Sequence, residues 1–103
     1  MQFPVEVRFA AGDDIWLSHG YGRESAYLAL HQYLGAPYEP YFRAFERVAV
    51  ALGGRPHWGK LHYLGAPELR AAYPRFDDFL AVRNRLDPGR VFANDYTTRV
   101  LGD

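Results

Sequence analysis

The chain has 103 residues, which suffice for one domain or for part of one. Its twelve acidic and twelve basic side chains balance, so nothing in the charge indicates nucleic acid or an anionic membrane as a partner. The absence of cysteine excludes disulfides and thiolate chemistry. Together with the lack of a signal peptide and of a membrane-length apolar stretch, it leads us to expect a cytoplasmic protein.

Two strands are predicted in the first third of the chain. Residues 3–10 alternate between two faces, an apolar one of Phe3, Val5, Val7 and Phe9 and a polar one of Glu6 and Arg8. The apolar run at 15–17 predicts a further, brief strand. Residues 25–34 predict the second long strand, with Tyr27, His31 and Tyr33 on one face.

Three helices are predicted in the rest of the chain. The first begins near Pro40, which suits a first helical turn, and ends before Gly53 and Gly54. A short helix is expected over residues 67–73. A longer one over 75–86 turns Phe76, Phe79, Leu80 and Leu86 inward and stops at the Asp-Pro-Gly sequence of 87–89. The tail, 91–103, is expected to be irregular or partly strand.

These elements predict an α+β fold, with a small antiparallel sheet of two or three strands and about three helices. Two strands hardly form a stable sheet by themselves. We therefore expect the strand edges to pair with another copy of the chain, another polypeptide or an N-terminal part outside this sequence. The pattern is that of the end of a larger protein.

The single lysine of the chain lies in the hexapeptide Arg55-Pro56-His57-Trp58-Gly59-Lys60, while the other eleven basic residues are arginines. Aromatic side chains that exclude water, combined with a few charges that fix orientation, suit a ligand pocket. The alternative is a surface turn in which Trp58 fills the core.

Other polar residues allow both a functional and a structural interpretation. Glu6 can orient the guanidinium of Arg8 toward a substrate oxygen, or the two can form a solvated ion pair worth under about 1 kcal/mol. His31 can accept a proton or bind a hydroxylated ligand, or be an ordinary half-buried histidine. Residues 94–96 can be a simple turn. No histidine pair has metal-ligand spacing beside a carboxylate, so no metal site is predicted.

Several segments, taken in order, carry a resemblance to a known family. They are Glu6-Val7-Arg8, Asp13-Asp14-Ile15-Trp16-Leu17-Ser18, His31-Gln32-Tyr33, the hexapeptide 55–60, Tyr73-Pro74-Arg75-Phe76, the run 86–96 (LDPGRVFANDY) and Val100-Leu101-Gly102. The set closely resembles the C-terminal end of the D-arabinono-1,4-lactone oxidase family. That family includes alditol oxidases and the gulono- and galactonolactone oxidoreductases, within the vanillyl-alcohol oxidase superfamily.

The resemblance implies that residues 1–103 are the C-terminal substrate-domain portion of an FAD enzyme that oxidises a sugar lactone or alditol, with oxygen as the expected acceptor. By the same resemblance Glu6, Arg8 and Lys60 are expected to be catalytic. His31, His57 and Trp58 are expected at the substrate, with Asn94 and Tyr96 at most tail contacts to the flavin-side domain. The proton acceptor stays open among Lys60, His31 and Glu6.

The sequence departs from the family in lacking the FAD-binding domain. We therefore expect FAD to be bound mainly by a separate domain or subunit, which becomes the partner of this chain. The alternative function is a non-catalytic module, left by truncation, that self-associates through its strand edges or binds a carbohydrate.

Overall fold

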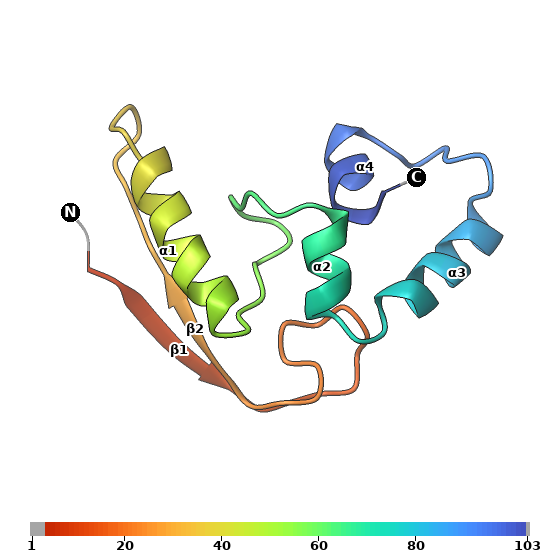
Figure 1. Cartoon of the computed structure of the whole chain (residues 1–103), viewed down its shortest axis with the longest axis horizontal. Helices are drawn as coiled ribbons and strands as arrows, with labels where there is room; N and C mark the ends of the chain where they lie inside the picture. Colours follow the sequence, from red (N-terminus) through yellow and green to blue (C-terminus); the bar gives the residue numbers. More distant parts are fainter. Residues whose placement is uncertain (1–3, 103) are drawn as a thin grey trace. The chain divides into compact units, whose positions relative to one another are not determined.

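The computed structural model describes residues 4–102. The chain divides into two compact units, Met1–Tyr63 and Leu64–Asp103. The elements in chain order are β1 (Glu6–Ala10), β2 (Ser25–Ala29), α1 (Glu39–Ala51), α2 (Ala66–Ala72), α3 (Phe76–Leu86) and α4 (Asp95–Leu101) (Figure 1). The predicted α+β class is confirmed, with a two-stranded sheet and four helices in the described residues. None of these helices combines the length and the apolar character that crossing a membrane requires.

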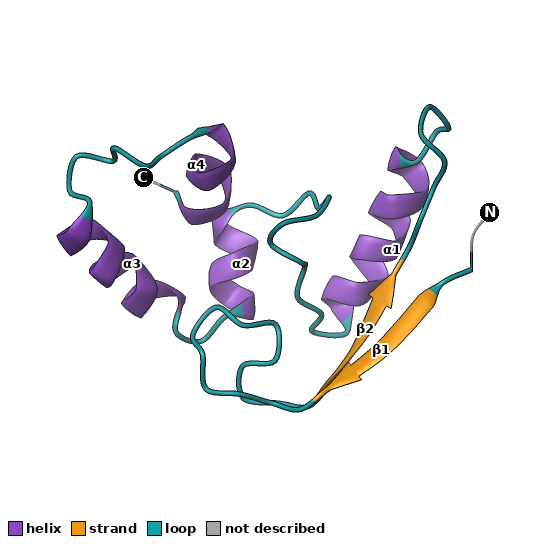
Figure 2. Ribbon diagram, turned by 180° about the vertical axis from the view of Figure 1, so that it is seen from behind, coloured by secondary structure: helices purple, strands orange, loops and turns teal. Residues whose placement is uncertain are grey.

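The strands β1 and β2 form an antiparallel hairpin (Figure 2) whose register runs from Glu6 opposite Ala29 to Ala10 opposite Ser25. The second strand is five residues long rather than the predicted ten. Continuing the register would place His31 opposite Pro4, which has no N–H to donate to the ladder. His31 therefore follows the strand instead of belonging to it. The predicted position of Phe3 lies outside the described residues.

The connection between the strands is an internally braced loop. The expected brief strand at 15–17 is wrong, because these residues form a turn organised by the Asp13 carboxylate, which accepts the Ile15 N–H at 3.0 Å and the Ser18 hydroxyl. A Cβ on Gly12 would lie 2.9 Å from the Arg23 carbonyl carbon, so glycine is required at this crossing of the chain.

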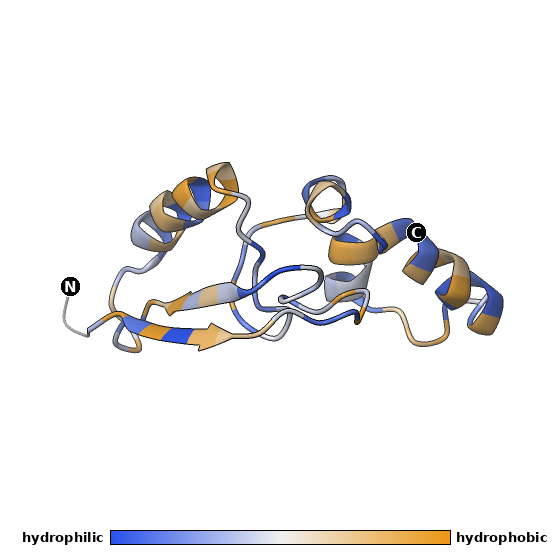
Figure 3. Cartoon of the chain, turned by 90° about the horizontal axis from the view of Figure 1, so that it is seen from below, coloured by the Kyte–Doolittle hydropathy of each residue, from blue (hydrophilic) through white to orange (hydrophobic). Residues whose placement is uncertain are grey.

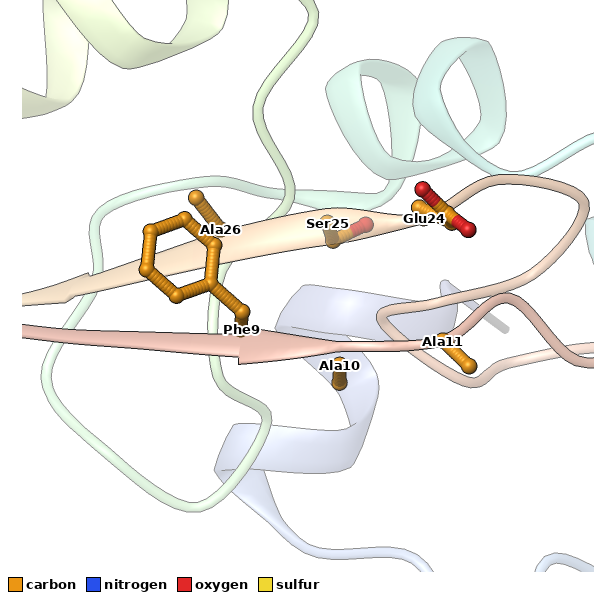
Figure 4. A pocket seen from close by; sticks show the side chains of 6 residues that line it. All are labelled: Phe9, Ala10, Ala11, Glu24, Ser25 and Ala26. Carbon is orange, nitrogen blue, oxygen red and sulfur yellow. The ribbon is translucent and has the colours of Figure 1, made fainter.

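The apolar face of the hairpin is uncovered in the described chain. Figure 3 shows the alternation of polar and apolar residues along β1, and Figure 4 shows Phe9 and Ala26 projecting to the same side. The exposed fractions are 50% for Val7, 82% for Phe9 and 50% for Leu28. Contiguous exposed apolar surface is typical of interaction sites; the expectation that the strand edges pair with other protein stays a prediction.

Helix α1 matches its prediction within one residue. Proline lies in its first turn, and Gly53, with φ of +78°, follows its end. A left-handed residue at this place is easiest for glycine. The Glu46 carboxylate of α1 accepts the Tyr63 N–H at 2.8 Å, and the Arg43 guanidinium lies 3.9 Å from the centre of the Tyr63 ring. These contacts tie the end of the first unit to its helix.

The second unit has a small core of large side chains. Its members, each at most 2% exposed, are Leu69, Tyr73, Phe76 and Val100. The inward position of Phe76 is confirmed, whereas Leu86 is 70% exposed and its predicted burial is wrong. Residue 86 is the last of α3, where no neighbouring element of the unit covers it.

Residues 95–101 form a helix, α4, where the sequence predicted irregular or strand structure. The Asn94 side chain accepts the Thr97 N–H at 2.9 Å, and the Thr97 hydroxyl accepts the Asn94 N–H at 2.8 Å. This reciprocal cap satisfies two donors at the helix start. Thr97, Thr98 and Val100 of this helix are β-branched and have low helix propensity. The packing of α4 against α2, which buries Val100, overrides this propensity.

Because Asn94 is a helix cap, Asn94→Ala is expected to lower the free energy of unfolding by about 1 kcal/mol. Asn94→Asp, which keeps an acceptor oxygen, should retain most of the stability. Urea unfolding of the three proteins measures both effects. Equal midpoints for the wild type and the alanine variant would show that the cap does not stabilise α4.

Candidate functional site

The polar face of the hairpin is set by the register of the two strands. Residues directly opposite one another in an antiparallel pair point to the same side. Arg8 pairs with Tyr27 and Glu6 pairs with Ala29. Glu6, Arg8 and Tyr27 therefore share one face of the sheet, opposite the apolar face.

The Glu6 carboxylate is the centre of a three-residue polar cluster. Arg8 donates from Nε and from a terminal nitrogen to Oε1 of Glu6. The Nε2 atom of His31 lies 3.6 Å from Oε2, the other carboxylate oxygen. The side chains of Glu6, Arg8 and His31 are 39%, 77% and 46% exposed, so the cluster can meet a ligand or a partner. An ion pair this exposed to solvent contributes little to stability.

The charge state of Glu6 follows from these contacts. The hydrogen bond from Arg8 and then its charge lower the pKa of the Glu6 carboxyl below its ordinary 4.5; burial opposes them, and His31 lowers the pKa to a lesser degree. Glu6 is therefore ionised at neutral pH and is a weak base. Its geometry suits holding the guanidinium of Arg8.

The hexapeptide 55–60 is attached to the loop between the strands by two side chains. Nη1 of Arg55 donates to the carbonyls of His19 at 3.1 Å and Tyr21 at 2.9 Å. The indole N–H of Trp58 donates to the carbonyl of Leu17 at 2.9 Å. Trp58 was predicted to contact the substrate, but the structure engages its only polar group within the chain.

Residues 57–60 form a tight turn, here called the Lys60 turn. The Lys60 N–H donates to the His57 carbonyl at 3.1 Å, and the Gly59 N–H donates to Nδ1 of His57 at 3.0 Å. Both His57 and Lys60 are exposed. Among residues 4–102 no aromatic group encloses the lysine, so the sequence-based expectation of a lysine confined among aromatic groups is not met here.

Two contacts between aromatic rings connect the Lys60 turn with the polar face of the hairpin. The centre of the His57 ring lies 5.0 Å from that of His19, and the His19 ring lies 5.7 Å from the Tyr27 ring in an edge-to-face arrangement. Tyr27 is directly opposite Arg8. The sequence analysis did not predict Arg55, His19 and Tyr27 as parts of the site. Each of them contacts a residue that is 8 to 38 positions away along the sequence.

The remaining predicted residues lie elsewhere. Asn94 and Tyr96 belong to the second unit, where Asn94 caps α4, and their contact with a flavin-side domain stays a prediction. A shallow hollow at the end of the hairpin where the strands meet their connecting loop is lined by Phe9, Ala10, Ala11, Glu24, Ser25 and Ala26 (Figure 4). No predicted site residue lines this hollow.

Comparison with known proteins now identifies the family. The sequence profile of D-arabinono-1,4-lactone oxidase matches residues 1–100. The chain belongs to the D-arabinono-1,4-lactone oxidase family. The resemblance carried by the ordered segments is thereby confirmed, and the chain is a member of an oxidoreductase family.

Several curated relatives of this family member match nearly its whole length. It is 59% identical to the L-gulono-1,4-lactone dehydrogenase of Mycobacterium tuberculosis over 99% of this chain and 24% of that protein. It is 40% identical to the L-gulonolactone oxidase of Bos taurus over 96% and 23%. It is 39% identical to the alditol oxidase of a Streptomyces species over 93% and 23%. The chain thus spans about a quarter of the length of the relatives it matches.

The Glu6–Arg8 contact gives a direct prediction. Arg8→Gln is expected to raise the pKa of Glu6 toward 4.5, because the hydrogen bond and positive charge that favour the carboxylate are lost. An NMR titration that follows the Glu6 side-chain carboxyl carbon measures the change. His31→Asn should raise the same pKa less, since His31 contributes less than Arg8. An unchanged Glu6 titration in Arg8→Gln would show that the two side chains are apart in solution.

Proposed function

We propose that the chain is the substrate-side portion of an FAD-dependent oxidoreductase that oxidises a CH–OH group of an aldono-1,4-lactone or alditol. The FAD-binding portion is supplied by another part of a longer protein or by a separate subunit. The observation that carries the proposal is the polar face, where the Glu6 carboxylate holds Arg8 and where stacked rings lead to the Lys60 turn.

The residues of the polar face fit one part of a bound flavin. FAD, when bound, supplies the acceptor for the hydride that leaves the substrate carbon. The guanidinium of Arg8 is 77% exposed and is already oriented by Glu6, so it can face the negative charge of a reduced cofactor. The sequence contains no glycine-rich phosphate loop, which agrees with a cofactor whose pyrophosphate is held by a different domain.

The cations of the chain have a direct role in this chemistry. A hydroxyl group that loses its proton while the attached carbon loses hydride develops negative charge on oxygen. Preorganised cationic donors stabilise such charge more than they stabilise the neutral substrate. We assign this role to Arg8 and Lys60, with Glu6 holding Arg8. With Lys60 as a cation, His31 is the candidate for the proton acceptor; Lys60 is the candidate in the alternative in which it is neutral and Arg8 alone is the cation.

Substitution of the two cations tests the assignment. In a flavin-loaded complex of the chain with its FAD-binding portion, Arg8→Gln and Lys60→Met are each expected to slow reduction of the flavin by an aldonolactone about 10²-fold or more, because each removes a donor to the developing oxyanion. Anaerobic stopped-flow absorbance of the flavin measures this rate.

Arg47→Gln is the matched control, because Arg47 is an exposed arginine on α1 outside the proposed site. It should reduce at the wild-type rate. Near-wild-type reduction in both Arg8→Gln and Lys60→Met would refute the roles given to these residues.

Molecular oxygen is the proposed electron acceptor. Relatives at 40% and 39% identity are named oxidases, while a relative at 59% identity is named a dehydrogenase. We expect the substrate-reduced complex to be reoxidised by oxygen, with hydrogen peroxide formed at the same rate. Reoxidation by an artificial dye but not by air would identify a dehydrogenase instead.

The exposed apolar face of the hairpin supports a second candidate function, a non-catalytic module that self-associates or binds a carbohydrate. Mixing the purified chain with its FAD-binding portion, FAD and an aldonolactone separates the two functions. A yellow complex whose flavin is bleached by an aldonolactone supports the oxidoreductase. A colourless oligomer that binds sugar without redox chemistry supports the module.

A further inference from the structure

We propose that His19 is a positioning residue of the site: its ring, held between Tyr27 and His57, fixes the Lys60 turn over the polar face of the hairpin. This inference rests on the function proposed for Arg8 and Lys60 and deepens it. It assigns the relative position of the two cations to a histidine that itself touches neither substrate nor cofactor.

The position of His19 is fixed on three sides. Its backbone carbonyl accepts a hydrogen bond from Arg55 at 3.1 Å. Its ring meets the Tyr27 ring at 71° and the His57 ring at 38°, with ring centres 5.7 and 5.0 Å away. The next residue, Gly20, is buried and donates its N–H to the Ser18 hydroxyl at 3.1 Å. The ring of His19 is therefore held in place by both backbone and aromatic contacts.

The ring contacts of His19 reach both cations of the proposed site. On one side Tyr27 stands directly opposite Arg8 in the sheet. On the other side His57 is the residue around which the Lys60 turn closes, through its carbonyl and its Nδ1. The Lys60 turn is otherwise attached through the Trp58 indole, which donates to the Leu17 carbonyl, and the contact between the His57 and His19 rings adds a second attachment on the side of the hairpin.

The surroundings of His19 favour its neutral form. Burial lowers the pKa of His19 below its ordinary 6.5, and the nearby charges of His57 and Arg55 lower it further, while Asp13 opposes them. The unfolded chain takes up this proton at a higher pH than the folded chain, so acidification below about pH 6.5 destabilises the folded arrangement. A protonated His19 would face the positive charge of Arg55, which Asp13 opposes, and the contact between the His19 and His57 rings should weaken.

A spin label on the turn tests this positioning in the 103-residue chain without any flavin. The chain has no cysteine, so Lys60→Cys provides a single attachment site. At pH 8 the label is expected to broaden the amide signals of Arg8 and Tyr27. We expect this broadening to be reduced in His19→Ala at pH 8, and to decline in the wild-type background as the pH falls below about 6.5 and through the lowered pKa of His19.

His19→Phe separates the ring contact from the charge. A phenyl ring keeps the stack and cannot be protonated, so the broadening should persist in this variant from pH 8 to pH 5. Broadening as strong in His19→Ala as in the wild-type background, or an acid-induced decline that is identical in His19→Phe, would overturn the inference. The label reports position alone, so these outcomes are independent of whether the chain supports flavin reduction.

The flavin-loaded complex adds a kinetic readout. His19→Ala should slow flavin reduction at saturating substrate about tenfold or more, because misplacement of a catalytic group by about 1 Å is costly. His19→Phe should restore the rate at pH 8. A phenylalanine variant as slow as the alanine variant would contradict positioning by the ring.

Discussion

The attachment of the hexapeptide 55–60 to the loop between the strands is the constraint on which the candidate site depends. A guanidinium and an indole N–H satisfy three carbonyls of an irregular loop, at distances of 2.9 to 3.1 Å. Carbonyls left without a partner in such a loop would be costly wherever water is excluded. Arg55 and Trp58 therefore serve the fold, and their placement brings His57 against His19. The Lys60 turn is held where a loop of its length could otherwise move freely.

The polar cluster on the hairpin has a different physical basis. It is exposed, so its ion pair contributes little to stability, and the exposure is what lets it meet a ligand or a second domain. The uncovered apolar face of the same hairpin is consistent with a chain that spans about a quarter of its relatives. One face of the sheet thus carries the proposed chemistry, and the other carries apolar surface suited to contact with further protein.

Periodicity predicted the parts of the fold that local rules control. The alternation around Glu6 and Arg8 and the proline and glycine signals at the ends of α1 were sufficient for β1 and α1. The extent of β2 depended on Pro4, which precedes β1, and α4 depended on a cap and on burial of Val100, which no short window reveals. For the site, the family resemblance pointed to Glu6, Arg8 and Lys60. The part played by His19 and Arg55 arises from contacts between distant segments and could not be derived from either segment alone.

A crystal structure of the flavin-loaded complex with a bound aldonolactone tests the central claim most directly. The distances to measure run from one substrate hydroxyl oxygen to the guanidinium of Arg8 and to Nζ of Lys60. Convergence of both groups on that oxygen, with Glu6 still bound to Arg8, is the predicted result. A lactone that contacts neither cation, or cationic groups on opposite sides of the hairpin, would contradict the account.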